Sequence, residues 1–295
     1  MRTVYLGTSE FAVAVLRRLA TSPHRPELVL TRPDRPQGRG RHPGPPPVAV
    51  AARELGIAVE QPASVNDEAT ARRLAELAPE AIAVCAFGAL IKEPLLSDYL
   101  MLNVHPSLLP RWRGAAPIER AIMAGDDETG VSIMRMSAGL DSGPVCAQQR
   151  EPIGPDDDYG RLAARLAATG GELLVGALDE RPECRPQDET GVTYAEKITA
   201  EDRRLDPALS AEALERVVRA LSPHIGAWVE IGDGTRLGVL QARARPGNAP
   251  AGKVVTEGAS APAIACAEGE LQLLEVKPPG RREMAGKDWL RGWRG

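Results

Sequence analysis

Short apolar runs alternate with helix-like segments through the first half of the chain, and this alternation restricts the fold more than any other feature. The strands expected from the apolar runs are residues 3–6, 27–31, 58–60, 81–86, 100–104 and 131–136. Nearly continuous apolar strands are buried on both faces, which is typical of parallel sheets covered by helices. The chain therefore predicts an α/β domain with a Rossmann-like, mostly parallel sheet.

Helical spacing fills the segments between these strands. Residues 10–20 form the first expected helix, with Thr8 or Ser9 as its N-cap. Further helices are expected at 48–55, at 66–77 with Asn66 as N-cap, at 116–124, and within 155–178. The turn from Gly7 to Phe11 does not match G-x-G-x-x-G, so we expect no nicotinamide cofactor.

The alternation of strands and helices ends near Thr190. One amphipathic helix is expected within residues 205–221, and it is followed by short strands at 227–231, 236–244, 252–256, 263–267 and 271–276. Several short, evenly spaced strands suggest a small β-barrel, and five strands with one helix suit an OB-like fold. We therefore expect a first domain at 1–188, a linker at 189–204 and an OB-like C-terminal domain at 205–295.

Composition and charge exclude several classes of protein. The chain has 295 residues, of which 43% are hydrophobic and 26% charged, and its net charge is −4, so any nucleic-acid contact needs local basic patches. Its four cysteines are far apart and form no C-x-x-C pair, which argues against zinc and against a disulfide framework and fits a reducing, cytoplasmic location. Neither a membrane span nor a metal site is expected.

A polar pair marks the end of the strand at 100–104. Asn103 and His105 are two residues apart, so their side chains share one side of the strand, and Pro106 keeps His105 extended. An amide donor beside a titratable imidazole at the carboxyl end of a strand suits carbonyl chemistry. By itself, His105 could equally be a buried structural histidine.

Two other segments are expected to lie near this pair. Phe87 and Gly88 follow the strand at 81–86, and ligands bind beyond the carboxyl ends of parallel strands, so they could share one cleft with Asn103 and His105. Asp141 lies in a turn between Gly139 and Gly143 and could orient His105. The local alternative for Asp141 is an ordinary Asx-turn.

Residues 32–47 form a long segment rich in proline, glycine and arginine, which cannot be a helix or a central strand. It carries Arg32, Arg35, Arg39 and Arg41 against a single acid, Asp34. A flexible cationic loop suits phosphate groups, and a solvated linker explains the composition equally well.

Several of these segments together resemble one family, the methionyl-tRNA formyltransferases. The segments that carry the resemblance are Gly7-Thr8-Ser9-Glu10-Phe11, the arginine-rich residues 32–40, Asn103 to Ile118 with its Ser107-Leu108-Leu109-Pro110 and Trp112-Arg113-Gly114 runs, Gly139-Leu140-Asp141-Ser142-Gly143, and Thr193 to Ile198. Asn-x-His with Ser-Leu-Leu-Pro and a later Asp is typical of folate-dependent formyltransferases in general. The arginine loop and the second domain favour the tRNA enzyme.

The resemblance implies transfer of a formyl group from 10-formyltetrahydrofolate to the α-amine of methionine on initiator tRNA. We expect the protein to be a monomer. It implies that Asn103, His105 and Asp141 are catalytic. The residues expected to bind folate are Phe87, Gly88, Ser107, Leu108, Leu109 and Pro110. Those expected to contact tRNA are Arg35, Arg39, Arg41, Arg111 and Arg113, because the chain as a whole is acidic.

The chemistry suggests a division of roles. Attack of an amine on the formyl carbon produces an oxyanion, toward which Asn103 and His105 could both donate hydrogen bonds. His105 could also move the proton. Asp141 could fix the tautomer of His105, favour its protonated form, or take that proton through water. Two alternatives remain at this point. One is a formyltransferase for a small amine, and the other is a tRNA-binding protein without catalytic activity.

Overall fold

The computed structural model describes residues 1–37, 42–232, 234–256 and 261–293, and the chain divides into two compact units. The first comprises Met1–Gly114, Thr129–Pro152 and Ala163–Tyr194, and the second comprises Ala115–Glu128, Ile153–Leu162 and Ala195–Gly295. The last and longest segment of the second unit begins at Ala195, within the expected linker. The second unit also includes two segments that the sequence assigned to the first domain.

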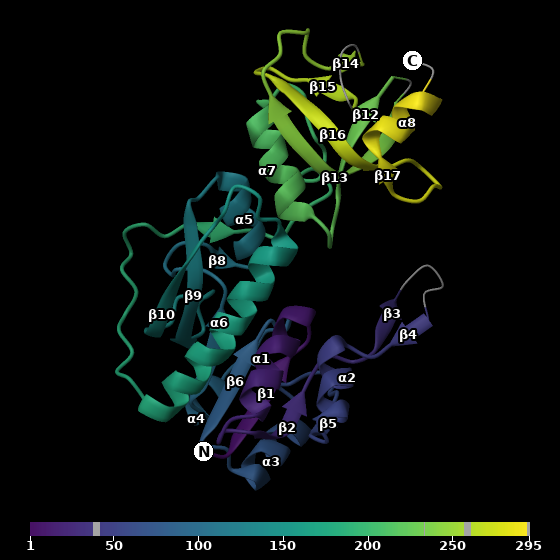
Figure 1. Ribbon diagram of the computed structural model, residues 1–295. Coiled ribbons are helices and arrows are strands. Elements are labelled where there is room, and N and C mark those ends of the chain that lie inside the picture. Colours follow the sequence, from purple (N-terminus) through teal and green to yellow (C-terminus); the bar gives the residue numbers. More distant parts are fainter. Residues whose placement is uncertain (38–41, 233, 257–260, 294–295) are drawn as a thin grey trace. The chain divides into compact units, whose positions relative to one another are not determined.

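A seven-stranded sheet forms the centre of the first unit (Figure 1). Its strand order is β10 (Val145–Pro152), β9 (Glu128–Arg135), β7 (Met101–His105), β6 (Ala81–Cys85), β1 (Thr3–Gly7), β2 (Pro26–Leu30) and β5 (Ala58–Glu60). The five strands from β7 to β5 are parallel, and β9 pairs with β7 in the antiparallel direction. The Rossmann-like, mostly parallel sheet is confirmed. Strand β10 was not expected, because its central residues are polar and exposed.

Helices cover both faces of this sheet. Helices α3 (Glu68–Leu77) and α4 (Leu95–Asp98) contribute Leu74, Leu95 and Leu96 to an apolar cluster with strand residues that include Val4, Ile82 and Met101. Strand alternation places the side chains of Asn103 and His105 on the same face as that of Met101. The structure thus directs the candidate site toward the α4 face of the carboxyl end of β7.

The opposite face packs against α1 (Glu10–Ala20) and α6 (Tyr159–Glu180), and α2 (Pro47–Glu54) lies beside α1. The Tyr5 hydroxyl on β1 donates to the carbonyl of Ala12 on α1 at 2.6 Å. A Cβ on Gly170 of α6 would lie 2.8 Å from Val104 Cγ1, so glycine is needed there for close packing on β7.

The N-caps of α1 and α3 show which polar side chain accepts a hydrogen bond from the first turn of each helix. Ser9 caps α1 by accepting from the Ala12 amide, in agreement with one of the two expected candidates. Asp67, and not the expected Asn66, caps α3. The Asn66 side chain instead bonds the carbonyl of Leu90 and the amide of Lys92, and so holds the segment after β6.

The arginine-rich segment contains a short antiparallel pair, β3 (Arg35–Gln37) and β4 (His42–Gly44), where an irregular loop was expected. Arg35 is exposed on β3. Arg39 and Arg41 lie outside the described residues, so their expected role stays a prediction.

The second unit contains a six-stranded antiparallel sheet, which confirms the expected change of architecture. Its strands are β12 (Ala227–Ile231), β13 (Thr235–Arg245), β14 (Val254–Val255), β15 (Ala263–Ala265), β16 (Glu270–Lys277) and β17 (Met284–Ala285). Its helices are α5 (Pro117–Ala124), α7 (Ala211–Leu221) and α8 (Gly286–Gly292). Leu214, Val218 and Leu221 of α7 share one buried cluster with strand residues such as Leu237 and Val276.

Two short strands complete the fold, β8 (Arg113–Gly114) and β11 (Tyr194–Ala195), the latter at the boundary between the units. Across the described part of the chain, no helix has both the length and the apolar character needed to cross a membrane.

The cysteines differ from the expectation. Cys146 on β10 forms a disulfide with Cys184, 38 residues later in sequence, although the wide spacing of the cysteines argued against a disulfide framework. Spacing fails as a guide here because the chain returns along β10 after α6, where Val145 and Arg185 exchange two backbone hydrogen bonds of 2.8 Å. Cys85 and Cys266 are free and buried.

An ion pair fixes the start of the second unit's longest segment. Arg120 of α5 makes two hydrogen bonds to the Asp202 carboxylate, at 2.7 and 3.1 Å, and the Thr199 amide and hydroxyl each donate to the same carboxylate at 2.8 Å. The Arg120 guanidinium is the main cause that lowers the pKa of Asp202 to about 2. The charged carboxylate therefore stabilises the folded state.

We expect Asp202→Asn to lower the free energy of unfolding by about 1–3 kcal/mol at pH 7, since it weakens hydrogen bonds to a charged group. A carboxyl whose pKa is depressed on folding contributes its stability above the unfolded pKa, and this contribution is lost as the pH falls through the folded pKa. The difference between the two proteins should therefore shrink between about pH 4 and pH 2. Urea titrations across that range measure it. Glu201→Gln is the matched control, because the Glu201 side chain is 85% exposed. An equal loss in the control would contradict the assignment.

Candidate active site

The carboxyl end of β7 carries the two polar residues that the sequence singled out. The side chain of His105 is buried, with 4% of the residue exposed, whereas Asn103 is half-buried. Both belong to the α4 face of the sheet by strand alternation. The strand ends in a tight turn after His105, where the Ser107 amide donates to the His105 carbonyl at 2.9 Å.

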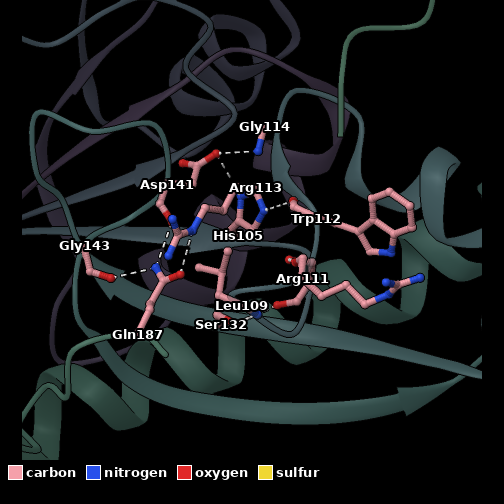
Figure 2. A network of polar contacts seen from close by, with 11 residues as sticks. His105, Leu109, Arg111, Trp112, Arg113, Gly114, Ser132, Asp141, Gly143 and Gln187 are labelled. Carbon is pink, nitrogen blue, oxygen red and sulfur yellow. Dashed lines mark hydrogen bonds and ion pairs between the residues drawn. The ribbon is translucent and has the colours of Figure 1, made fainter. Parts of the chain in front are cut away.

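The imidazole of His105 lies between a backbone carbonyl and a carboxylate (Figure 2). Its Nε2 is 2.9 Å from the carbonyl oxygen of Trp112, and its Nδ1 is 3.7 Å from Oδ2 of Asp141. A carbonyl oxygen can only accept, so we assign the hydrogen of the neutral ring to Nε2. Nδ1 is then the nitrogen that can accept a proton, and it faces the carboxylate of Asp141.

This arrangement brings His105 and Asp141 together, as the sequence predicted. Of the alternative roles expected for Asp141, fixing the tautomer falls to the carbonyl of Trp112. Asp141 is placed to stabilise a proton on Nδ1, which is another of those alternatives. Trp112 is held in turn by a hydrogen bond from its amide to the Thr193 hydroxyl at 2.9 Å, with a positive φ of 63°.

Three anchors hold the loop that carries Asp141. Its carboxylate accepts from the amide of Gly114 at 2.9 Å, and its backbone adopts the left-handed region with φ at 44°. The amide nitrogen of the Gln187 side chain donates to the carbonyls of Asp141 and Gly143, both at 2.8 Å. A Cβ on Gly143 would overlap the carbonyl oxygen of Arg135, so only glycine allows this close approach.

The residues expected to bind folate after His105 form a braced turn. The hydroxyl of Ser107 is buried and donates to the Arg111 carbonyl at 2.6 Å. Ser132 of β9 holds the turn at two points, because its hydroxyl donates to the Ser107 carbonyl at 2.6 Å and accepts from the Leu109 amide at 3.1 Å. Ser107 is therefore placed to shape the turn, whereas Leu109 and Pro110 line a cavity of about 520 Å³.

That cavity does not include the catalytic candidates. Among the described residues its lining comprises Leu109 and Pro110, β10 residues such as Cys146, and the segment that ends with Gln187 and Asp188. Asn103, His105 and Asp141 are absent from this set. The cavity therefore lies beside the braced turn, and we do not identify it with the reaction site.

The segment after β6 forms a second wall near the strand ends. The hydroxyl of Thr8, in the turn after β1, donates to the Phe87 carbonyl at 2.7 Å, and so the turns that follow two neighbouring parallel strands are joined. Gly88 has a positive φ of 71°, and a Cβ there would meet no atom within 4 Å, so space is open beside it. Phe87 itself is buried in the apolar cluster on the α4 face.

Two exposed leucines adjoin these candidate segments. Leu90 follows Gly88, and Leu140 precedes Asp141; they are 67% and 63% exposed. Neither was selected from the sequence. The available signal was an apolar residue placed in a polar turn beyond the end of a strand.

The arginines expected to contact phosphate are placed differently from one another. Arg111 is half-buried, and its guanidinium lies 4.4 Å from the centre of the Trp112 ring. Arg113 is 4% exposed, and its Nε donates to Oε1 of Gln187 at 2.9 Å. This burial corrects the expectation for Arg113, since a guanidinium held inside the protein is unavailable to a phosphate.

Sequence reasoning missed three groups of the site: the carbonyl of Trp112, the amide of Gly114 and the side chain of Gln187. The first two are backbone groups, whose roles no side-chain pattern reveals. Gln187 lies far along the chain in a polar segment expected to lead into a linker. Within the described residues, no group of three or more His, Cys, Asp or Glu side chains is arranged to hold a metal ion.

Comparison with known families and relatives adds independent information. The formyl transferase family matches residues 1–178, and the formyl transferase C-terminal domain matches residues 197–294. The chain is 45% identical over 303 residues to the methionyl-tRNA formyltransferase of Halorhodospira halophila, which covers 99% of this chain and 96% of that protein. It is 45% identical over 296 residues to the methionyl-tRNA formyltransferase of Thermus thermophilus, with the same coverage of both.

Solved structures share the fold at lower identity. HypX from Aquifex aeolicus in complex with tetrahydrofolic acid aligns with a TM-score of 0.66 at 19% identity, covering 98% of this chain and 47% of that chain. The methionyl-tRNA formyltransferase from Clostridium thermocellum aligns with a TM-score of 0.59 at 15% identity, covering 84% and 95% respectively. At these identities the likeness shows the fold alone.

We expect Gly143→Ala to lower the free energy of unfolding by about 1–3 kcal/mol, because the added methyl overlaps backbone and must displace the loop of Asp141. The matched control is Gly176→Ala in α6, where a Cβ meets nothing within 4 Å and helix propensity favours alanine by about 0.5–1 kcal/mol. Thermal or urea unfolding of both variants measures the difference. Equal stability of the two would show that Gly143 is not needed for close packing.

Proposed function

The chain belongs to the methionyl-tRNA formyltransferase family, and from this premise we propose that it transfers a formyl group from 10-formyltetrahydrofolate to the α-amine of methionyl initiator tRNA. The observation that carries the proposal is the buried imidazole of His105, whose Nε2 is bound to the Trp112 carbonyl and whose Nδ1 faces Asp141. Asn103, two residues before His105 on β7, completes the group. This arrangement suits a reaction that must move one proton and stabilise one oxyanion.

The amine of methionine is itself the nucleophile, so the protein needs no covalent intermediate. In the balanced reaction the amine nitrogen bonds to the formyl carbon, the bond from that carbon to the folate nitrogen breaks, and the amine proton is passed on to that nitrogen. The bound formyl donor supplies the electrophilic carbon. The side chains of the protein must therefore handle charge and protons.

His105 is the proposed proton-transfer residue, through Nδ1. Its Nε2 hydrogen is held by the Trp112 carbonyl, so the neutral ring presents an unprotonated nitrogen. The carboxylate of Asp141 at 3.7 Å stabilises the ring while it carries the extra proton. Because the Nε2 hydrogen is already used, we assign the hydrogen bond to the oxyanion to Asn103. One oxyanion donor typically contributes about 3 kcal/mol to catalysis.

Several described residues near the strand ends support a folate site. A pterin ring is flat and largely apolar on its faces, and the exposed side chains of Leu90 and Leu140 would lose contact with water against it. The space beside Gly88 admits a close approach to backbone. Leu108, Leu109 and Pro110 belong to the turn that Ser107 and Ser132 hold rigid. We propose that these residues contact the folate while Phe87 supports the wall from its buried position.

The tRNA requires positive charge on an otherwise acidic chain. We propose that Arg35, Arg39 and Arg41 contact phosphates, with Arg111 beside the reaction site and with further contacts from the second unit. Arg35 is exposed, as such a role requires. We further propose that the protein acts in the cytoplasm as a monomer. These assignments predict binding that weakens steeply as salt is added.

A formylation assay with labelled 10-formyltetrahydrofolate tests the function directly. We expect transfer to initiator methionyl-tRNA, much less to elongator methionyl-tRNA and little to free methionine.

His105→Ala should lower kcat by about 10²–10⁴-fold with folate binding largely intact, because it removes the proton acceptor. Efficient formylation of small amines alone would support a small-molecule formyltransferase. Firm tRNA binding without turnover would indicate a non-catalytic protein, and normal turnover of His105→Ala would overturn the role of that residue.

Arg39→Ala tests the arginine segment separately. We expect it to raise KM for tRNA far more than KM for folate. It should also reduce the slope of log KM for tRNA against log salt concentration by about 1, the amount that corresponds to one lost phosphate contact. Arg72→Ala is the charge-matched control, because Arg72 is an exposed arginine on α3. If Arg39→Ala raised both KM values equally, the segment would not act on tRNA.

A further inference from the structure

The half-buried side chain of Gln187 connects three parts of the site with its single amide group (Figure 2). Its oxygen accepts from Nε of Arg113 at 2.9 Å. Its nitrogen donates to the carbonyl of Asp141 and to that of Gly143, each at 2.8 Å. The amide therefore uses both of its N–H groups on the loop that carries Asp141.

The backbone that presents Gln187 is itself fixed. Arg185, two residues earlier, exchanges two hydrogen bonds of 2.8 Å with Val145 on the edge strand β10. Cys184 is joined to Cys146 on the same strand by the disulfide. The side chain of Gln187 thus reaches the loop of Asp141 from a segment attached to the central sheet.

Arg113 determines which way the amide of Gln187 points. A guanidinium can only donate, so the amide oxygen must face Nε of Arg113 and the amide nitrogen must face the loop. Arg113 is buried, its amide donates to the Thr193 carbonyl at 2.9 Å, and its Nη2 lies 3.6 Å from the Glu189 carboxylate. A buried, anchored cation therefore holds the amide in one orientation.

The loop of Asp141 needs such support. Asp141 adopts a φ of 44°, a region that costs energy for a residue other than glycine and persists where surrounding contacts enforce it. The two carbonyls that Gln187 binds lie on either side of Ser142, so they fix the turn itself. The carboxylate of Asp141 then reaches the Gly114 amide and faces His105.

From these contacts we propose that Gln187, oriented by Arg113, is a positioning residue that holds Asp141 against His105 during formyl transfer. The proposal rests on the proposed function for its kinetic readout. The amide of Gln187 is occupied by Arg113 and the loop of Asp141, and Gln187 is not among the residues that we propose contact the amine or the folate. Its loss should therefore act on kcat and leave both KM values nearly unchanged. A misplacement of about 1 Å in a catalytic group can cost about a hundredfold in rate.

Two substitutions separate the two halves of the amide. Gln187→Met keeps a side chain of similar length and removes all three hydrogen bonds of the amide. Gln187→Glu keeps an acceptor for Arg113 and places a carboxylate oxygen against the two loop carbonyls. We expect both variants to lower kcat by about 10- to 100-fold, with KM for folate and for tRNA within about twofold of the parent. Gln149→Met on the exposed face of β10 is the matched control, and it should leave kcat unchanged.

Hydrogen exchange at the Gly114 amide gives a readout that does not depend on activity. This amide donates to Asp141, so both Gln187 variants should lose protection there while the Ser107 amide keeps it. Unchanged kcat would overturn the proposal, and so would a fall in kcat with the Gly114 amide still protected. Full activity of Gln187→Glu would also overturn it, because the bonds to the loop would then be dispensable. If the parent protein formylates no amine, the proposed function fails, and the exchange measurement still decides the role of Gln187.

Discussion

The hydrogen bond between His105 Nε2 and the carbonyl of Trp112 is the interaction on which the rest of the site depends. It assigns the hydrogen of the neutral ring to one nitrogen and leaves the other, Nδ1, as the acceptor. The further contacts hold this arrangement in place. Thr193 holds Trp112, Asp141 faces Nδ1, and the Gly114 amide holds the carboxylate of Asp141. Without this bond neither ring nitrogen would be assigned the hydrogen, and the same residues would define no direction for the proposed proton transfer.

The fold provides this precision by joining rigid elements at a single sheet edge. His105 ends a parallel strand that is buried on both faces, and Ser132 on the neighbouring antiparallel strand braces the turn that follows. Asp141 comes from the loop between β9 and β10, and Gln187 from the segment bonded to β10. Each of these segments is therefore anchored to a strand of the central sheet, which limits how far the polar groups can move.

The sequence predicted the sheet, the change of architecture in the second half, and the side chains of Asn103, His105 and Asp141. Each of these leaves a local signature, such as an apolar run or a polar residue at the end of a strand. Trp112 and Gly114 act through backbone atoms, which carry no such signature. Gln187 and the Cys146–Cys184 pair depend on where the chain returns after α6, and that is a property of tertiary structure. Arg113 was read as a surface charge because composition does not distinguish a buried arginine from an exposed one.

The most direct test of this account is a double-mutant cycle on kcat/KM for initiator methionyl-tRNA, built from His105→Ala, Asp141→Asn and the double variant. If Asp141 acts by stabilising the proton that His105 receives, removing His105 also removes the contribution of Asp141. The double variant should then be about as slow as His105→Ala alone, which is strong non-additivity. Losses that simply add in free energy would show that the two residues act independently, and they would contradict the account.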